Sequence, residues 1–194
     1  LSIRRHATSK ITSQDDLHNI STLGFRGEAL ASITSVARLE LRTRRQIDDL
    51  GWVLYSEPNV APSIEPIQTD VGTQVIVKNL FYNVPARKKF LRSDITEFRH
   101  ISDSMIKLAL SHPETAFTFC DETSAVFSVK KQSLKERIIE FYGDEFKNNL
   151  YEIFIQEAGL TIRGYIGDPA LAKPLRSYQH LYLNKRAVNH RALN

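Results

Sequence analysis

Alternating hydrophobic and polar positions predict a series of β-strands along the chain. Over residues 36–43, Ala37, Leu39 and Leu41 alternate with charged side chains, which is typical of a half-buried strand. Similar runs predict strands over residues 52–55, 73–77, 115–120, 125–129, 150–155, 160–166 and 180–184. The segment between the second and third of these strands contains Pro58, Pro62 and Pro66, so we expect a loop there.

Spacings of three and four between apolar residues predict the helices. The longest example comprises Ile95, Phe98, Ile101, Met105 and Leu108. Asp94 occupies the N-cap position of this helix, and His112-Pro113 ends it. A second helix is predicted after Ser133, which forms a capping box with Glu136, and Gly143 suits its C-terminal cap. A short helix is expected over residues 28–35.

The order of these elements favours an α+β fold, because hairpins and helices occur in clusters rather than in strict alternation. We expect sheets that are covered by helices on one face. No internal repeat is visible, and a domain boundary is plausible near Lys131–Gln132, although no Pro- or Gly-rich linker marks it.

Composition adds a local charge asymmetry to this picture. The 194 residues are 42% hydrophobic with a net charge of +4, which fits a folded chain and excludes intrinsic disorder. A single cysteine, Cys120, excludes an internal disulfide framework, and no apolar run is long enough to span a membrane. Five basic and no acidic residues follow residue 168, namely Lys173, Arg176, Lys185, Arg186 and Arg191. This basic end is a candidate nucleic-acid contact or an ordinary solvated surface.

The segment Gly24-Phe25-Arg26-Gly27 is the densest candidate for chemistry. Two glycines flank an arginine where a helix is expected to start, so backbone N–H groups and a guanidinium would be available to phosphate oxygens. The same pattern also occurs in simple tight turns. It is neither a Walker P-loop nor a G-x-G-x-x-G motif.

Two further segments are candidates for the same ligand. Thr8, Ser9 and Lys10 offer two hydroxyls and an ammonium to phosphate, or form a polar surface turn. Thr73, at the start of a predicted strand, could bond a nucleotide or pair across the sheet.

Four sequence motifs, taken in order, closely resemble the MutL family of DNA mismatch-repair ATPases. They are RHATSKI from Arg5, LGFRGEALASI from Leu23, GT-V-V from Gly72 and LFYNVPARKKFL from Leu80. YIGDP from Tyr165 and LYLNKRAV from Leu181 extend the resemblance over essentially the whole chain. This family shares a superfamily with DNA gyrase, a heat-shock chaperone and the sensor histidine kinases.

The resemblance implies a division into two partial domains. Residues 1–131 would be the C-terminal part of an α/β-sandwich ATP-binding domain, and residues 132–194 the start of a transducer domain with a ribosomal-S5-like α+β fold. Thr8, Ser9 and Lys10 would match a lid that orders over ATP, and Thr73 a strand residue near adenine. Residues 24–27 would match the triphosphate loop, so ATP binding is implied for Gly24, Phe25, Arg26 and Gly27. Arg186 would match a DNA-contacting position, with Lys185 and Arg176 in support.

The resemblance also implies the function of the full protein. ATP and Mg²⁺ would be its cofactors, and lid ordering would drive homodimerisation into a clamp on DNA without sequence preference. The catalytic Glu and the Mg²⁺-binding Asn would lie before Leu1, and a γ-phosphate-binding Lys beyond Asn194. This chain would therefore carry no catalytic residue and would not hydrolyse ATP alone. A mismatch-recognition protein and a downstream nuclease or helicase would be partners, in a bacterial cytoplasm near the nucleoid or in a eukaryotic nucleus.

Two alternative functions remain at this point. One is the ATPase subunit of a type II topoisomerase, which pairs a similar nucleotide fold with an S5-like transducer; FRGEAL and LFYNVPAR argue against it. The other is a nucleotide-binding paralogue that lacks turnover.

Overall fold

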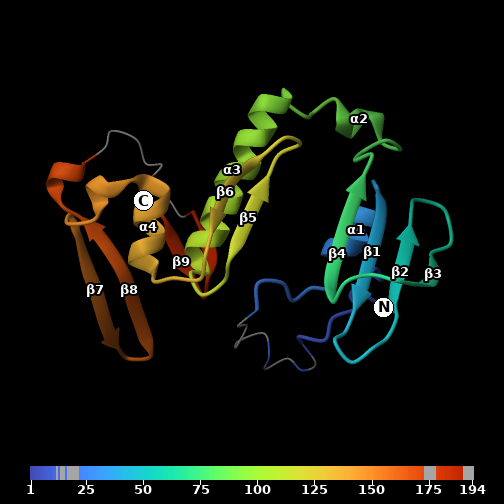
Figure 1. Cartoon of the computed structure of the whole chain (residues 1–194), viewed down its shortest axis with the longest axis horizontal. Helices are drawn as coiled ribbons and strands as arrows, with labels where there is room; N and C mark the ends of the chain where they lie inside the picture. The colour runs from blue at the N-terminus through green and yellow to red at the C-terminus, as the bar shows by residue number, and fades with distance from the viewer. Residues whose placement is uncertain (12, 14–15, 17–21, 173–177, 190–194) are drawn as a thin grey trace. The chain divides into compact units, whose positions relative to one another are not determined.

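The computed structural model describes residues 1–11, 13, 16, 22–172 and 178–189 (Figure 1). The chain forms two compact units, Leu1–Ser93 and Asp94–Asn194. This division falls before the long central helix, whereas the sequence places the domain boundary near Lys131. The assignment of residues 1–131 and 132–194 to two functional domains stays a prediction.

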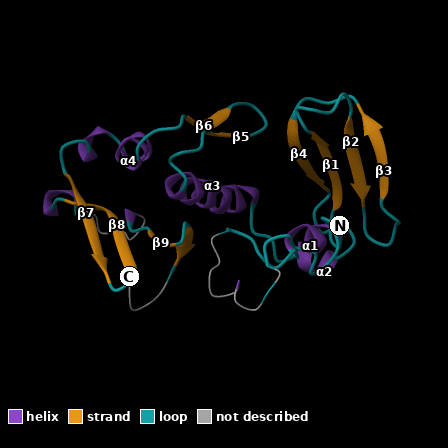
Figure 2. Ribbon diagram, turned by 90° about the horizontal axis from the view of Figure 1, so that it is seen from below, coloured by secondary structure: helices purple, strands orange, loops and turns teal. Residues whose placement is uncertain are grey.

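A four-stranded antiparallel sheet organises the first unit. It contains β1 (Arg38–Arg44), β2 (Gly51–Ser56), β3 (Ser63–Ile67) and β4 (Gly72–Lys78), in the order β3-β2-β1-β4 (Figure 2). The strands predicted over residues 36–43, 52–55 and 73–77 are confirmed within one or two residues. The expectation of a loop around Pro66 was wrong, because Pro66 lies in β3 opposite Trp52. As β3 is an edge strand, a residue without an N–H is tolerated there.

A short helix, α1 (Ala29–Thr34), packs against β1 and closes a small core. Ala31 of the helix, Ala37 in the following turn, Leu39 of β1 and Val53 of β2 are all buried. The expected helix over residues 28–35 is therefore confirmed. A one-turn helix, α2 (Pro85–Lys88), follows β4; Pro85 is its first residue, where a missing N–H costs nothing.

Glu40 is one of the charged residues that alternate with apolar residues in the strand predicted over residues 36–43, and the solvent exposure that this pattern predicts for it was wrong. Its side chain is buried, and it forms ion pairs with Arg42 and with Lys78, whose Nζ lies 3.2 Å from Oε2. Arg42 Nε also donates to Glu40 Oε1 at 2.6 Å, and this bond lowers the pKa of the carboxyl group. Two cationic neighbours thus make burial of this carboxylate tolerable.

In its described residues, the second unit consists of two α-helices and three antiparallel hairpins. The helices are α3 (Asp94–Ser111) and α4 (Leu134–Tyr142). The hairpin strands are β5 (Phe117–Cys120) with β6 (Ala125–Val129), β7 (Leu150–Glu157) with β8 (Leu160–Gly167), and β9 (Leu181–Leu183) with β10 (Arg186–Val188). Two short 3₁₀ turns, η2 (Asp144–Phe146) and η3 (Pro169–Leu171), precede and follow the middle hairpin. None of the described helices is long and apolar enough to cross a membrane.

The predicted ends of these elements are largely confirmed. Ser133 and Glu136 form the expected capping box at the start of α4, and Gly143 caps its end with a φ of 104°. Asp121 Oδ1 accepts from the N–H groups of Thr123 and Ser124, both at 2.7 Å, and so shapes the β5–β6 turn. The last predicted strand proves to be a hairpin, since β10 pairs with β9 after the turn at 184–185.

A row of aromatic rings connects α3, the β5–β6 hairpin and α4. Phe98 stacks on Phe119, Phe119 contacts Phe127, and Phe127 meets Phe141 edge-on, with centroid separations of 5.6, 5.6 and 5.1 Å. Such pairs stabilise by about 0.5–1.5 kcal/mol each beyond the area they bury. The row fixes the hairpin between the two helices.

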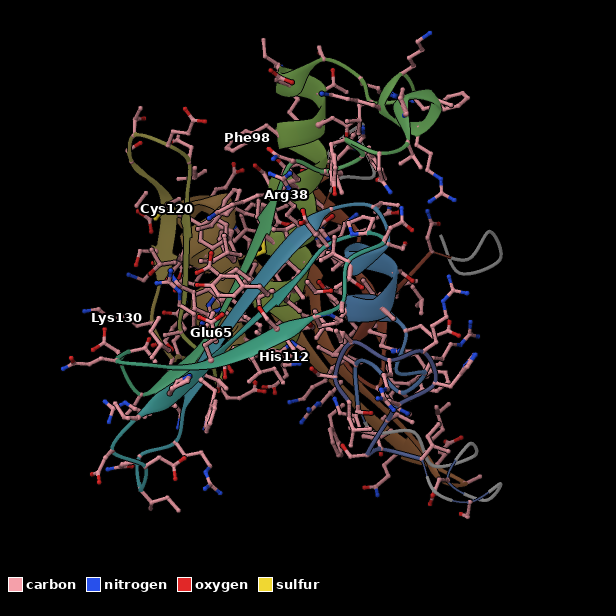
Figure 3. The ribbon with its side chains drawn as sticks, turned by 90° about the vertical axis from the view of Figure 1, so that its right-hand side faces the viewer. Arg38, Glu65, Phe98, His112, Cys120 and Lys130 are labelled. Carbon is pink, nitrogen blue, oxygen red and sulfur yellow. The ribbon has the colours of Figure 1, made fainter. Side chains whose placement is uncertain are left out.

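Arg137 of α4 is completely buried. Its Nη1 donates to the carbonyl oxygen of Ala109 at 2.9 Å, near the end of α3. Its Nη2 donates to the carbonyl oxygens of Pro113, Thr115 and Lys130 at 3.2, 3.0 and 2.5 Å. Figure 3 labels Lys130 and also His112, which directly follows α3.

No carboxylate bonds to this guanidinium among the contacts of the described residues; backbone carbonyls take that role. Burial lowers the pKa of Arg137, because the charged form loses its hydration. The carbonyl oxygens at the end of α3 carry the negative end of the helix dipole and so offset part of this cost. Arg137 therefore connects α4 to two stretches of backbone, residues 109–115 at and after the end of α3, and Lys130 just after β6.

Replacing Arg137 by Met is expected to lower the free energy of unfolding of the chain by about 3 kcal/mol, because several carbonyl groups lose their donor inside the fold. Arg137→Lys should recover only part of the loss, since an ammonium lacks the planar fork. Urea unfolding followed by circular dichroism measures both variants. Lys135→Ala, on the same helix, is the control, and equal stability of the Met variant and this control would contradict the prediction.

Candidate nucleotide and nucleic-acid sites

The phosphate loop, residues 24–27, leads directly into α1. Arg26 is exposed, and its guanidinium carbon lies 5.5 Å from the ring centroid of the half-buried Phe25. Thr22 Oγ1 donates to the carbonyl oxygen of Gly24 at 3.1 Å and shapes the entry to the loop. Because α1 has only six residues, a phosphate bound at this loop would rely on the loop N–H groups and Arg26 rather than on a long helix dipole.

Gly27 brings the first two sequence motifs together. Its φ is 63°, and a Cβ atom added there would lie 2.3 Å from the carbonyl oxygen of Ala7. Next to this contact, His6 Nδ1 lies 3.1 Å from Glu28 Oε1. Only glycine allows so close an approach of two backbones in a left-handed conformation. The segment that contains Thr8, Ser9 and Lys10 is thereby packed beside the phosphate loop.

Thr8, Ser9 and Lys10, the predicted lid residues, form a local turn that exposes the Ser9 and Lys10 side chains. Thr8 Oγ1 accepts from the N–H group of Lys10 at 3.2 Å. Ser9 and Lys10 are exposed. Lys10 thus lies three residues after Ala7, whose backbone contacts Gly27, and its exposed ammonium is available to an anionic ligand.

Thr73 is paired within the sheet. Its Oγ1 lies 2.9 Å from Thr43 Oγ1, its register partner on β1, and Thr43 also donates to the carbonyl oxygen of Gly72. The cross-strand pairing that the sequence allowed for Thr73 is thus observed. A contact of Thr73 with a nucleotide stays a prediction.

The LFYN motif forms hydrogen bonds with the turn between α1 and β1. The N–H group of Phe81 donates to the carbonyl oxygen of Val36 at 2.7 Å, and Asn83 Nδ2 donates to that of Ser35 at 3.0 Å. Phe81 adopts a left-handed conformation, with a φ of 62°. The guanidinium carbon of Arg38, a residue labelled in Figure 3, lies 5.2 Å from the centroid of the Tyr82 ring. The motif thus supports the element that follows the phosphate loop, a role that its sequence alone did not reveal.

In the second unit, the predicted DNA-binding residues lie on the β9–β10 turn. Asn184 and Lys185 are both left-handed, with φ values of 48° and 65°, as in a two-residue hairpin turn. Lys185 is exposed, and Arg186 is half-buried at the start of β10. Arg176 lies outside the described residues.

Three contacts that the sequence did not predict fix this hairpin. Tyr182 Oη donates to the carbonyl oxygen of Lys107 on α3 at 3.1 Å, and His180 Nε2 lies 2.5 Å from Tyr142 Oη on α4. Burial lowers the pKa of His180 and raises that of Tyr142 to about 12. Finally, Lys185 Nζ lies 2.5 Å from Glu114 Oε1, just beyond α3. These partners are distant in sequence, so no local pattern identifies them.

Within the described parts of the chain, His, Cys, Asp and Glu side chains do not gather in groups of three that could hold a metal ion.

Gly27→Ala is expected to destabilise the chain by about 1–3 kcal/mol, because the new methyl group would be strained by its φ and would collide with Ala7. The matched control is Gly24→Ala, since a Cβ atom at Gly24 meets nothing within 4 Å and its φ is not left-handed. Urea unfolding of both variants tests the difference. If the two substitutions had equal effects, the close approach of residues 7 and 27 would be wrong.

Comparison with known proteins places this geometry in context. A family model described as "DNA mismatch repair protein, C-terminal domain" matches residues 138–194. MutL of Chlorobaculum tepidum is 42% identical over 193 residues, which is 100% of this chain and 31% of that protein. MutL of Parabacteroides distasonis is 40% identical over 190 residues, again 31% of its length. The chain thus spans about a third of these relatives.

Solved structures agree with the sequence relatives. The Aquifex aeolicus MutL ATPase domain complexed with ADP superposes with a TM-score of 0.71 and 30% identity, over 94% of this chain and 68% of that one. The N-terminal domain of a DNA repair protein superposes with a TM-score of 0.73 at 24% identity, over 90% of this chain and 58% of that one, which shows a shared fold. The α+β fold is therefore that of a MutL ATPase domain, and the chain belongs to the MutL family of DNA mismatch repair proteins.

Proposed function

We propose that this chain supplies the phosphate-gripping and DNA-contacting residues of a mismatch-repair ATPase. In the full-length protein, ATP would order the lid residues 8–10, and this ordering would drive dimerisation into a clamp on DNA. The observation that carries the proposal is the backbone contact between Gly27 and Ala7, because it packs the lid segment against the phosphate loop. One relative of known structure, the Aquifex aeolicus MutL ATPase domain, was solved with ADP, which supports a nucleotide as the ligand.

The charges on the two segments suit a triphosphate. Arg26 would bind phosphate oxygens with its planar fork, and Lys10 would add a point charge from the lid. Mg²⁺ would accompany the nucleotide, but its ligand and the catalytic Glu are expected outside these residues, so we expect no turnover by the 194-residue chain. A lid that orders only when the triphosphate is bound would make the conformation of the protein depend on which nucleotide it holds.

The basic turn in the second unit would bind the DNA backbone without reading sequence. Arg186 and Lys185, with Arg176 in support, would contact phosphates, and phosphate contacts carry no base information. A homodimer would place two such turns on one duplex. The mismatch-recognition protein and the downstream nuclease or helicase remain partners proposed from the family, as does a cytoplasmic, nucleoid-associated location in a bacterium.

The topoisomerase alternative finds no support in the relatives compared above, which are mismatch-repair proteins. A paralogue that binds nucleotide without turnover stays an alternative. Steady-state ATP hydrolysis by the full-length protein separates the two cases.

Arg26→Ala is expected to weaken ATP binding by the full-length protein tenfold or more, since a charged hydrogen bond contributes about 1.5–3 kcal/mol. Titration of a fluorescent ATP analogue measures this Kd. Arg45→Ala is the control, because Arg45 pairs with Asp48 in the β1–β2 connection and belongs to none of the proposed sites. Equal affinities of the two variants would contradict the assignment of Arg26.

Arg186→Gln is expected to weaken DNA binding and to reduce the slope of log K against log salt by about 1, as for the loss of one phosphate contact. Fluorescence anisotropy with a duplex of arbitrary sequence, between 50 and 200 mM salt, measures both quantities. Arg163→Gln, the same charge change on β8, should leave the slope unchanged. An unaltered slope for the Arg186 variant would remove this residue from the DNA contact.

A further inference from the structure

Lys185, one of the two described residues of the proposed DNA contact, is already engaged by a carboxylate. Its Nζ lies 2.5 Å from Glu114 Oε1, and each side chain is 47% exposed. The ion pair lowers the pKa of Glu114, so the carboxylate is ionised at neutral pH. A DNA phosphate would therefore meet an ammonium group that has an anionic partner.

The Glu114 side of this pair is held by the fold. The Arg137 guanidinium donates to the carbonyl oxygens of Pro113 and Thr115, the two neighbours of Glu114. The N–H group of Thr115 also donates to the carbonyl oxygen of His112 at 3.0 Å. The backbone of Glu114 is thus fixed from both sides, although its carboxylate reaches solvent.

The Lys185 side is held as well. Lys185 is left-handed in a two-residue turn, and Tyr182 on the preceding strand is bonded to the backbone of α3. Because both residues start from fixed backbones, their pairing orders only the two side chains. The contact is therefore a built feature of the second unit.

A carboxylate and a phosphate offer the same chemistry to an ammonium group, namely anionic oxygens that accept its N–H bonds. A DNA phosphate at Lys185 would be attracted by the ammonium and repelled by the adjacent carboxylate. We propose that Glu114 acts as an internal competitor for Lys185 and thereby limits the affinity of the basic turn for the DNA backbone. This inference rests on the proposed DNA contact, and it assigns to Glu114 a function in setting DNA affinity.

The Glu114–Lys185 pair should affect how DNA binding depends on salt. A lysine that stays paired with a carboxylate does not release a DNA counterion, so it adds nothing to the slope of log K against log salt. Removal of the competing charge would free the lysine for a phosphate. The slope should then become steeper by about 0.9, the value for one additional phosphate contact on duplex DNA.

Glu114→Gln in the full-length protein tests this, because it keeps the size and an acceptor oxygen but removes the charge. We expect DNA to bind about twofold to fivefold more tightly at 50 mM salt, with the steeper slope, in anisotropy titrations with a duplex of arbitrary sequence. Glu122→Gln, in the exposed β5–β6 turn of the same unit, is the charge-matched control and should leave both quantities unchanged. Equal behaviour of the two variants would overturn the proposal, and weaker binding by Glu114→Gln would show that the pair only positions Lys185.

Lys185→Ala gives an independent test that leaves Glu114 intact. It should weaken binding less than twofold in the wild-type background but about fivefold in the Glu114→Gln background. A large loss in the wild-type background would also overturn the competition. If the wild-type protein binds DNA and Arg186→Gln reduces the slope while Glu114→Gln has no effect, this inference alone fails. If the Arg186 substitution has no effect either, the proposed DNA contact itself fails.

Discussion

The buried guanidinium of Arg137 is the constraint on which the second unit depends. It reaches the end of α3, the connection to β5 and the end of β6 from a position on α4, and carbonyl oxygens rather than a carboxylate surround it. Lysine would not serve here, because a single ammonium cannot address acceptors that are spread around a plane. Two of these bonds also fix the backbone on both sides of Glu114. Arg137 thus stabilises the second unit and also positions the carboxylate that pairs with the basic turn.

In the first unit, close backbone packing has the corresponding role. Gly27 is required by its left-handed φ and by its contact with Ala7, whereas Gly24 has free space around it. Asn83 and Phe81 then fix the turn after α1, so the LFYN motif supports the same region from the opposite end of the helix. The LFYN motif thus has a structural role, and the segment with Gly27 has a structural role as well as being a candidate ligand-binding element.

Local signals in the sequence predicted what local forces determine. The capping box of Ser133 and the strands that flank the Asp121 turn depend on neighbours within a few residues, and these predictions are confirmed. Long-range contacts determine three other features: the burial of Arg137, the burial of Glu40, and the pairing of Lys185 with Glu114. Hydrophobic patterning along the chain predicts none of these, because it does not report contacts between distant residues. The edge strand with Pro66 was missed because proline opposes a strand everywhere except at a sheet edge. For the ATP and DNA sites, the family motifs supplied the candidates, and the structure adds their local geometry.

We propose two electropositive sites with separate functions: Lys10 and Arg26 for nucleotide phosphates, and the β9–β10 turn for the DNA backbone, where Arg186 is the main contact and Glu114 restrains Lys185. If lid ordering drives clamp formation, ATP and DNA must affect each other's binding, and linkage makes this effect reciprocal. The most direct test is the DNA affinity of the full-length protein at fixed salt, with and without a non-hydrolysable ATP analogue. We expect tighter DNA binding with the analogue and an equal gain in analogue affinity with DNA. Identical DNA affinity in both states would contradict ATP-driven clamp formation.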